Sequence, residues 1–394
     1  MANTLKFGNG QWGTKVGSAL AYNDEDGNFK PLPFNFTRST SGTRINKDGL
    51  IEVVTNNKPR IDFKDDAKGA LLLEPSRTNL ITYSEDFSQW GTLIDGTGVV
   101  PNVTSNFAIS PDGTQNADKI VFSRASSGGS DYTLIKSDYG GADINGIASI
   151  YLKSDSNVDI EITSDDVNYQ TITVTTEWKR FEVSDTTSDR LTFGLRGSEP
   201  STLNATIYAW GAQLEAGSYA TSYIPTQGAI STREGESCSQ TPPVGIIGQT
   251  EGTLFVNVNL GKSTEINTSV PIRFNLNNGI STANWVFIGI EGGDDLRVYV
   301  RANASNSVDF IKNAVFPSSG NYKIGMSFKS NKTVCYVNGV LQYSVNLGIV
   351  PNNLNSIGLG GAITGDAALE KSQTKEVKLY NTALTDAELQ ALTS

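Results

Sequence analysis

Short runs in which apolar and polar residues alternate recur along most of this chain. Residues 158–163 and 171–175 place an apolar side chain at every second position, and residues 254–260 do the same. Residues 296–301 alternate with charged side chains on one face. Because the side chains of a β-strand point to opposite faces in turn, this period of two predicts half-buried strands.

Turn signals separate these runs. Residues 43–53 read as a tight hairpin around Asp48-Gly49, and Asn338-Gly339 is the best hairpin signal in the chain. A type I′ turn needs positive φ at both central residues, which Asn, Asp and Gly tolerate best. Strands at short, regular spacing with Gly, Ser and Asp between them favour antiparallel sandwiches. The sequence therefore predicts an all-β protein.

One helix is expected, at the C-terminal end. Thr385 can cap it while Glu388 reaches back to the cap, which is the capping-box pattern, and Leu389 and Leu392 follow. The fold class expected is thus tandem antiparallel β-sandwiches with a turn-rich N-terminal segment and a short C-terminal helix.

Breaks in the pattern indicate domain boundaries. The first part of the chain is dense in turn residues, and a later stretch that contains Pro242-Pro243 has no periodicity and favours an extended connector. The expected division is an N-terminal segment at 1–82, a sandwich at 83–226, a linker at 227–250 and a second sandwich at 251–394.

Composition and charge exclude several classes of function. The 394 residues suffice for two or three domains, only 18% are charged, and 39 are glycine, as in a loop-rich β protein with neutral polar faces. The formal net charge of −10 would repel a phosphate backbone, so nucleic-acid binding is not expected. No run is long enough for a membrane span, and the N-terminal residues lack the apolar core of a secretion signal.

The chain contains no histidine. That excludes a Ser-His-Asp triad, a Cys-His pair, His-ligated zinc and histidine general-base catalysis. Two cysteines, Cys238 and Cys335, are too few for a disulfide framework and are expected to be free thiols. No motif signals an enzyme, so we expect a protein without catalytic activity.

Several short sequence segments resemble segments of known bacteriophage proteins. Residues 210–217 with 223–226 resemble the closing strand of the carbohydrate-binding-module-like jelly rolls of phage tail and fibre proteins, and 110–120 resemble the early strand entry of the same family. Residues 69–87 resemble the N-terminal region of phage-encoded adhesion proteins. The resemblance implies that 83–226 form a jelly roll.

The last third resembles a different family. Residues 336–340 are similar to the central hairpin of a laminin-G or concanavalin A-like sandwich, and 378–389 are similar to the ending of laminin-G-like domains. This resemblance implies a second sandwich at 251–394.

Together the resemblances imply a bacteriophage virion protein, a tail-fibre, head-fibre, spike or decoration component assembled in the host cytoplasm. Its N-terminal segment would attach to other virion proteins, and its sandwiches would bind host-surface glycans. Proteins of this family are usually homotrimers, and many weak lectin-like contacts would then add up across copies. Two alternatives stay open: a purely architectural decoration protein that binds no sugar, and, third, a polysaccharide depolymerase.

A sugar site needs aromatic faces for the pyranose rings and polar groups for the hydroxyls. Tyr132, Tyr139 and Tyr169 lie near Gly- or Asp-containing loops and are the glycan-binding candidates. Trp178 and Trp210 fit core positions of alternating strands and are interpreted as structural, and Trp285 is placed in a buried strand. No cofactor is expected, although loop carboxylates leave a calcium ion open.

Overall fold

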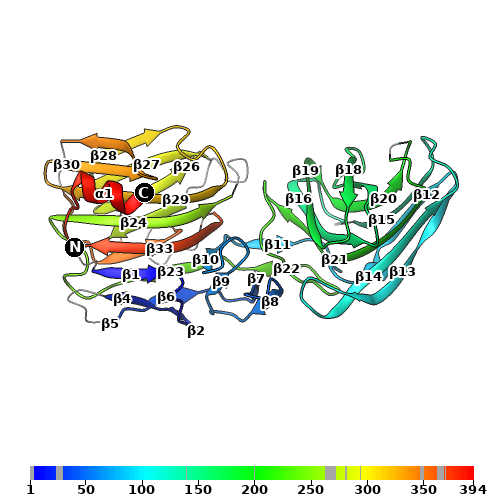
Figure 1. The fold of residues 1–394 in the computed structure, drawn as a ribbon, viewed down its shortest axis with the longest axis horizontal. Helices are drawn as coiled ribbons and strands as arrows, with labels where there is room; N and C mark the ends of the chain where they lie inside the picture. Colours follow the sequence, from blue (N-terminus) through cyan, green and yellow to red (C-terminus); the bar gives the residue numbers. More distant parts are fainter. Residues whose placement is uncertain are drawn as a thin grey trace. The chain divides into compact units, whose positions relative to one another are not determined.

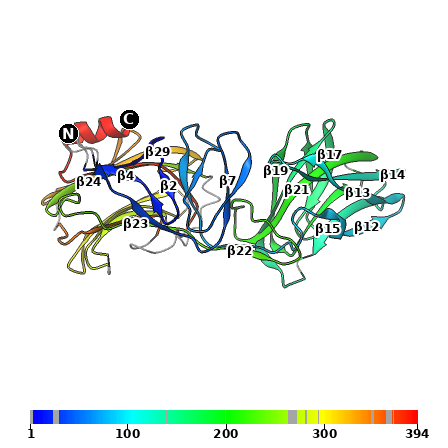
Figure 2. The same ribbon diagram turned by 90° about the horizontal axis from the view of Figure 1, so that it is seen from below.

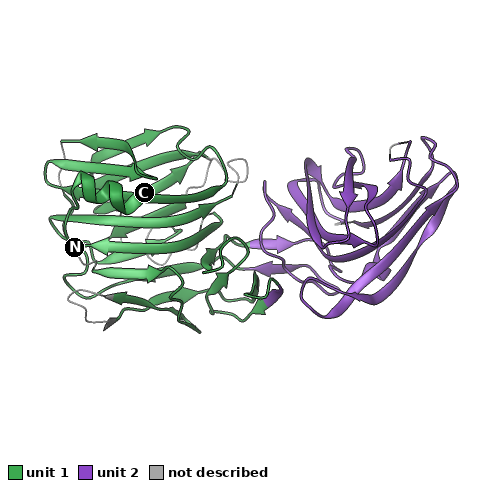
Figure 3. Ribbon diagram, viewed as in Figure 1, with its two compact units in different colours: residues 1–49, 53–76, 234–394 green, residues 50–52, 77–233 purple. Residues whose placement is uncertain are grey.

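The computed structural model describes residues 4–23, 30–138, 140–198, 200–261, 272–279, 282–292, 294–346, 350–361, 368 and 370–394. The chain forms two compact units (Figure 3). The first unit comprises 1–49, 53–76 and 234–394, and the second comprises 50–52 and 77–233. Both are built from antiparallel sheets, and one short helix ends the chain, so the predicted all-β class is confirmed.

The first unit contains a ten-stranded sheet. Its strands are β1 (Leu5–Gly8), β4 (Ala21–Asn23), β5 (Lys30–Pro31), β9 (Arg60–Asp62), β10 (Ala70–Leu73), β24 (Glu251–Leu260), β29 (Gly320–Lys329), β30 (Lys332–Val337), β31 (Val340–Val345) and β33 (Ser372–Tyr380). They run in the order β31-β30-β29-β24-β33-β1-β4-β5, and β10 pairs with both β33 and β9 (Figure 1).

A nine-stranded sheet forms the other layer of this unit. Its strands, in sheet order, are β2 (Thr14–Lys15), β3 (Ser18–Ala19), β6 (Phe34–Thr37), β23 (Ser237–Gln240), β32 (Ser356–Leu359), β25 (Ile272–Asn277), β26 (Trp285–Glu291), β27 (Asp295–Ala302) and β28 (Ser305–Lys312). Side chains from both sheets share one core, in which Leu254, Val256 and Val258 of β24 meet Ile288 and Val298 of the facing sheet. The alternation predicted for residues 254–260 is therefore confirmed.

Strands from opposite ends of the chain build this first unit. Leu5 of β1 lies opposite Leu379 of β33, and Phe36 of β6 lies opposite Cys238 of β23. The second unit is thus an insertion between β10 and β23. This arrangement differs from the linear order of domains expected from the sequence, because 1–76 and part of 227–250 supply strands to the sandwich that 251–394 complete.

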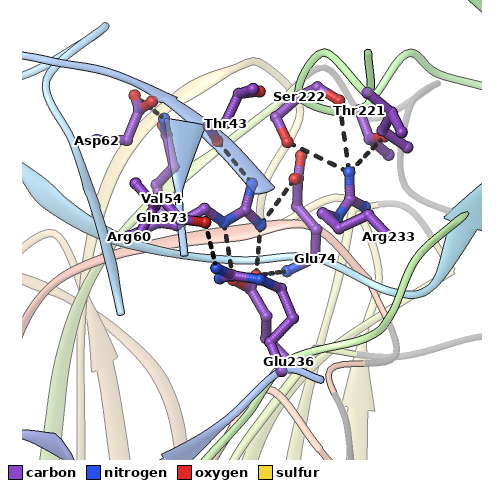
Figure 4. Close-up of polar contacts among 12 residues, drawn as sticks. Thr43, Val54, Arg60, Asp62, Glu74, Thr221, Ser222, Arg233, Glu236 and Gln373 are labelled. Atoms are coloured by element: carbon purple, nitrogen blue, oxygen red, sulfur yellow. Dashed lines mark hydrogen bonds and ion pairs between the residues drawn. The ribbon is translucent and has the colours of Figure 1, made fainter. Parts of the chain in front are cut away.

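A buried ion cluster joins the segments on either side of the insertion within the first unit. Arg60 donates to Glu236 at 2.7 Å and pairs with Glu74 at 2.9 Å, and Arg38 pairs with Glu236 at 2.7 Å (Figure 4). All four side chains are fully buried. Burial alone disfavours the charged guanidinium, but the carboxylates of Glu236 and Glu74 outweigh it and raise the pKa of Arg60.

The second unit is a sandwich of two five-stranded sheets (Figure 2). One has the order β12-β15-β20-β17-β18 and the other the order β13-β14-β21-β16-β19. The elements are β11 (Arg77–Asn79), the 3₁₀ helix η2 (Phe87–Gln89), β12 (Gly91–Asp95), β13 (Gly98–Ile109), β14 (Gln115–Arg124), β15 (Tyr132–Asp138), β16 (Ile144–Ser154), β17 (Val158–Thr163), β18 (Gln170–Val174), β19 (Lys179–Ser188), β20 (Arg190–Arg196), β21 (Asn204–Ala216) and β22 (Ser231–Arg233).

The sequence segments that resemble phage proteins are joined to one another by hydrogen bonds. The side chain of Asn79 donates to the carbonyls of Ala212 and Ile224 and accepts from the amides of Ile81 and Leu214. Further along, the amide of Thr221 donates to Glu215 at 2.9 Å. These side chains are buried and satisfied by the fold, so the motif has a structural role.

The predicted local signals are found in the structure. Asn338 and Gly339 have φ values of 46° and 75° between β30 and β31, as a type I′ turn requires. Strands β7 (Gly42–Ile45) and β8 (Ile51–Val54) flank the predicted Asp48-Gly49 turn. Helix α1 (Asp386–Thr393) begins with the predicted capping box of Thr385 and Glu388.

Both cysteines are free, as expected, and the structure shows that both are buried. Cys238 lies in β23, and burial, followed by the nearby Glu236, raises its pKa; burial raises the pKa of Cys335 to about 12. Only the thiolate is nucleophilic.

We predict that neither thiol reacts with Ellman's reagent in the native protein. Relative to its ordinary value of 9.0, the pKa of Cys335 lowers the thiolate fraction about a thousandfold, and burial blocks access. After unfolding in guanidinium chloride two thiols should titrate. A fast-reacting thiol before denaturation would contradict the burial of these strands.

Candidate functional site

Two of the three tyrosines expected at a ligand rim lie on one face of the sheet β12-β15-β20-β17-β18. Tyr132 lies opposite Arg196 in the pairing of β15 with β20. The guanidinium of Arg196 lies 4.2 Å from the centre of the Tyr169 ring. Tyr139 lies outside the described residues. The structure therefore brings Tyr132, Arg196 and Tyr169 together, and we refer to these three residues as the tyrosine cluster.

Tyr169 is already engaged by the protein. Its hydroxyl donates to Asp166 at 3.4 Å, and Asp166 pairs with Arg190. Burial, together with the nearby charge of Asp166, raises the pKa of Tyr169 to about 12. Since Arg196 also covers one ring face, Tyr169 has less free surface for a ligand than the sequence suggested. Tyr132 and Tyr169 are both half-buried.

A second group of aromatic side chains lies on the outer face of the other sheet. Lys119 of β14, Tyr208 of β21 and Lys153 of β16 are consecutive cross-strand partners. Their sequence neighbours Ile120 and Ile207 point into the sandwich core, so these three side chains point away from it. A lysine, a tyrosine and a second lysine thus form a row across three strands.

Phe107 joins this row from a bulge in β13. The pairing of β13 with β14 shifts between Thr104 and Ala108, and Asn106 within the bulge has a φ of 54°. The amide of Asn106 donates to Asp118 at 2.8 Å, which holds the bulge in place. The Phe107 ring lies 6.0 Å from the Tyr208 ring at an interplanar angle of 19° and is 45% exposed. Bulges commonly re-aim a side chain in this way.

Trp178 completes the group just before β19. Its indole nitrogen donates to the carbonyl of Ile109 at 3.0 Å, and the ammonium of Lys153 lies 5.6 Å from its ring. The sequence interpretation placed Trp178 in the core, but the side chain is half-buried on the outer face. The reason is that alternation assigns a residue to a face without saying which face is solvated. Trp210, by contrast, is 1% exposed and structural as expected.

We refer to Phe107, Trp178 and Tyr208 with Lys119 and Lys153 as the aromatic patch. Sequence reasoning missed it, although one signal was present. In the strand that holds Tyr208, the flanking Ile207 and Ala209 alternate with it, which marks a tyrosine on the face opposite the core. The gathering of the other residues depends on strand register and on the β13 bulge, which the sequence pattern does not show.

A polar pocket of about 380 Å³ lies in the same unit beside the β13 bulge. Residues that line it include Tyr83, Glu85, Asn106, Asn116 and Asp118. Asn116 donates to Glu85 at 3.1 Å, while its own side-chain carbonyl oxygen is buried with no hydrogen-bond partner among the described residues. Asn106 lines the pocket and precedes Phe107, so the pocket and the patch share one short segment.

Three carboxylates line the pocket, those of Glu85, Asp86 and Asp118, and each accepts hydrogen bonds from the fold. Asp86 accepts from the amide of Ser88 at 3.2 Å. Glu85 accepts from Tyr223 at 2.7 Å, and Asp118 accepts from the amides of Phe87 and Asn106. Burial raises the pKa of Glu85 and that of Asp118. A glycosidase needs two carboxylates free to act on either side of a bond. All three instead accept hydrogen bonds that hold loops in place.

The first unit has an aromatic cluster of a different kind. Trp285, Phe287 and Tyr299 lie together at 7%, 1% and 6% exposure, so the predicted burial of Trp285 is confirmed. The guanidinium groups of Arg273 and Arg297 stack over these rings. Because the rings are covered by paired arginines, this cluster offers little free aromatic surface.

Metal and membrane features are absent from the described part of the chain. Within it, no three His, Cys, Asp or Glu side chains gather as a metal-ion site. No helix there has the length and apolar character needed to cross a bilayer.

Comparison with known proteins gives structural likeness only. No protein-family model matches the sequence, and no curated protein matches it either. The solved structures similar to it include the CBM40 module of the Ruminococcus gnavus IT-sialidase bound to α2,6-sialyllactose. That match has 14% identity and a TM-score of 0.32 over 37% of this chain and 85% of that one.

Two other similar structures are parts of carbohydrate-active enzymes. The leech intramolecular trans-sialidase with 2,7-anhydro-Neu5Ac matches at 19% identity and a TM-score of 0.34, over 40% of this chain and 26% of its own length. Domain 4 of the arabinanase AbnA from Geobacillus stearothermophilus, with arabinotriose, matches at 15% identity and a TM-score of 0.31, over 45% and 82%. Each match spans less than half of this chain, and none assigns a ligand to it.

Proposed function

We propose that this protein is a non-catalytic glycan-binding protein of a bacteriophage virion, and that its second unit binds the glycan through the aromatic patch. The virion role is supported by the resemblance of 69–87 and 210–226 to phage adhesion proteins. Attachment to other virion proteins through residues 1–82 would use the surface of the first unit, since most of that segment is built into its sheets. A homotrimer, as in the resembled family, completes the proposal.

The observation that carries glycan binding is the exposed aromatic surface of the patch. Phe107 is 45% exposed and the nearby Ile109 is 54% exposed. The apolar face of a pyranose ring packs well on such rings, while nearby polar groups bind its hydroxyls. Asp155, which accepts from the Tyr208 hydroxyl at 3.0 Å, is one such group.

Binding rather than catalysis is supported by the hydrogen bonds that the acidic side chains of the pocket already accept from the fold. The chain has no histidine, and Glu85 and Asp118 in the pocket beside the patch are held by hydrogen bonds from the fold. A shallow binding surface needs no reactive group, because its affinity comes from stacking and from repeated copies.

A glycan array probed with the full-length protein and with a Phe107→Ala variant tests this proposal. We expect the wild-type protein to bind at least one glycan, and the variant to bind it about tenfold more weakly, since one stacking contact contributes roughly 1.4 kcal/mol. Phe107 is already half-exposed, so its loss should leave the fold intact.

Tyr132→Ala is the matched control, because it removes an aromatic ring from the tyrosine cluster on the opposite sheet. It should leave binding unchanged. If Tyr132→Ala abolished binding and Phe107→Ala did not, the site would belong to the tyrosine cluster. Failure of the wild-type protein to bind any glycan would overturn the proposal in favour of an architectural role.

A further inference from the structure

We propose, on the basis of the function proposed above, that the aromatic patch selects acidic glycans, those with a carboxylate or sulfate on the sugars that it binds. The patch combines stacking surface with two ammonium groups. The inference rests on where those two groups lie and on what surrounds them.

Both ammonium groups lie over the aromatic rings. The Nζ atom of Lys119 is 3.8 Å from the centre of the Phe107 ring. The Nζ atom of Lys153 is 5.6 Å from the ring centres of both Trp178 and Tyr208. Cation–π attraction holds each ammonium over a ring face, so the two charges lie within the aromatic patch, where a sugar on the exposed parts of the rings would meet them.

Neither ammonium has a carboxylate partner among the described residues. Other lysines do: Lys332 pairs with Asp386, and Lys375 pairs with Asp66. The carboxylate nearest to Lys153 in the sequence is that of Asp155, which follows the end of β16, is exposed and accepts a hydrogen bond from the Tyr208 hydroxyl. The aromatic patch therefore holds two ammonium groups that pair with no carboxylate of the described residues, and both are available to bind an anionic ligand.

The patch is positively charged at Lys119 and Lys153, whereas the chain as a whole is negatively charged. The net charge is −10, which by itself would repel an acidic polymer. Salt screens exposed charges beyond about 8 Å at physiological ionic strength, so an anion at the patch interacts mainly with the two nearby lysines. Hydrogen bonds from an ammonium to a carboxylate or sulfate are about twice as strong as those between neutral groups.

The spacing of the lysines allows both to act on one ligand. β14 and β16 are separated by β21, so Lys119 and Lys153 lie two strand spacings apart, about 10 Å. A segment the size of a disaccharide bridges that interval. One acidic chain laid across the row could meet both ammonium groups while a ring lies on the patch between them.

The test uses four polysaccharides, each paired with a form that has lost its charge. The probes are hyaluronan and polygalacturonate with their carboxyl-reduced forms, chondroitin sulfate with chondroitin that is both desulfated and carboxyl-reduced, and dextran sulfate with dextran. Binding of the full chain is measured by biolayer interferometry at low and at high NaCl. The double variant Lys119→Gln/Lys153→Gln removes both charges and keeps both stems, and Lys119→Arg/Lys153→Arg keeps both charges.

We expect at least one charged probe to bind at least tenfold more tightly than its neutral form. The glutamine variant should lose that tenfold preference and the arginine variant should keep it, and high NaCl should reduce binding of the charged probe only. Equal affinity within every pair, together with loss on Phe107→Ala, would overturn this inference and leave the proposed function standing. Absence of binding to all eight probes by the wild-type protein would count against both.

Discussion

Replacing Glu236 with alanine is expected to destabilise the first unit by about 3–5 kcal/mol, a large part of the stability of a typical domain. Glu236 accepts from both Arg38 and Arg60, at 2.7 Å in each case, and also from the backbone amide of Glu74 at 2.9 Å. Without it, the fully buried guanidinium of Arg38 loses the carboxylate that it pairs with, and that of Arg60 keeps only its pairing with Glu74.

The size of the effect comes from desolvation. An intact buried ion pair gains little net stability, because the cost of removing both charges from water nearly cancels their attraction. Removing one partner leaves the other charge buried and unpaired, so the full cost remains. The same substitution also removes the hydrogen bond from the Glu74 amide to Glu236, and a hydrogen bond to a charged group contributes roughly 1.5–3 kcal/mol.

Urea denaturation followed by far-UV circular dichroism measures this change, with an unchanged m-value as the check that the two states compared are the same. Asp309→Ala is the matched control, since Asp309 also pairs with an arginine, Arg297 at 2.9 Å, but is 35% exposed. That surface pair should contribute at most about 1 kcal/mol. Equal effects of the two variants would show that the Glu236 cluster is not a buried one.

Replacing Asn79 with alanine is expected to destabilise the second unit by at least about 4 kcal/mol. Its buried amide makes four hydrogen bonds to backbone groups, two as donor to Ala212 and Ile224 and two as acceptor from Ile81 and Leu214. Each buried backbone group left without a partner costs roughly 1 kcal/mol or more, and alanine replaces none of these bonds.

Hydrogen exchange locates this effect. The amide of Leu214 donates to Asn79 and should lose most of its protection in the variant, in addition to the fall in the global free energy of unfolding. Thr78→Ala is the control, because Thr78 is next to Asn79 and its side-chain hydroxyl bonds to that of Thr232 at an exposed position. It should cost less than about 1 kcal/mol. A loss of less than about 1 kcal/mol in the free energy of unfolding of the Asn79→Ala variant would contradict a structural role for this motif.

Much of the secondary structure could be predicted because its causes are local. The alternation in 158–163 and 296–301 reflects the two-residue period of a strand, and both segments are strands in the structure. The Asn338-Gly339 turn follows from the φ values these residues tolerate. The capping box needs only residues three apart.

The candidate site was predicted in part. Choosing Tyr132 and Tyr169 identified two rings that the structure brings to one face with Arg196. The aromatic patch was not predicted, because Phe107, Trp178 and Tyr208 come from three separate parts of the chain. Only the register of five strands and one bulge places them together.

By itself, the sequence determined that this chain forms strands, where several of its turns lie, and that histidine chemistry is absent from it. The tertiary structure decided which strands are partners: that β1 completes the sheet of β33, that 77–233 are inserted into the first sandwich, and that Arg60 meets Glu236. The reason is physical. A strand's own pattern shows which side chains face the core, but its backbone hydrogen bonds fit any neighbour, so the choice of partner is made by packing and charge in the assembled core.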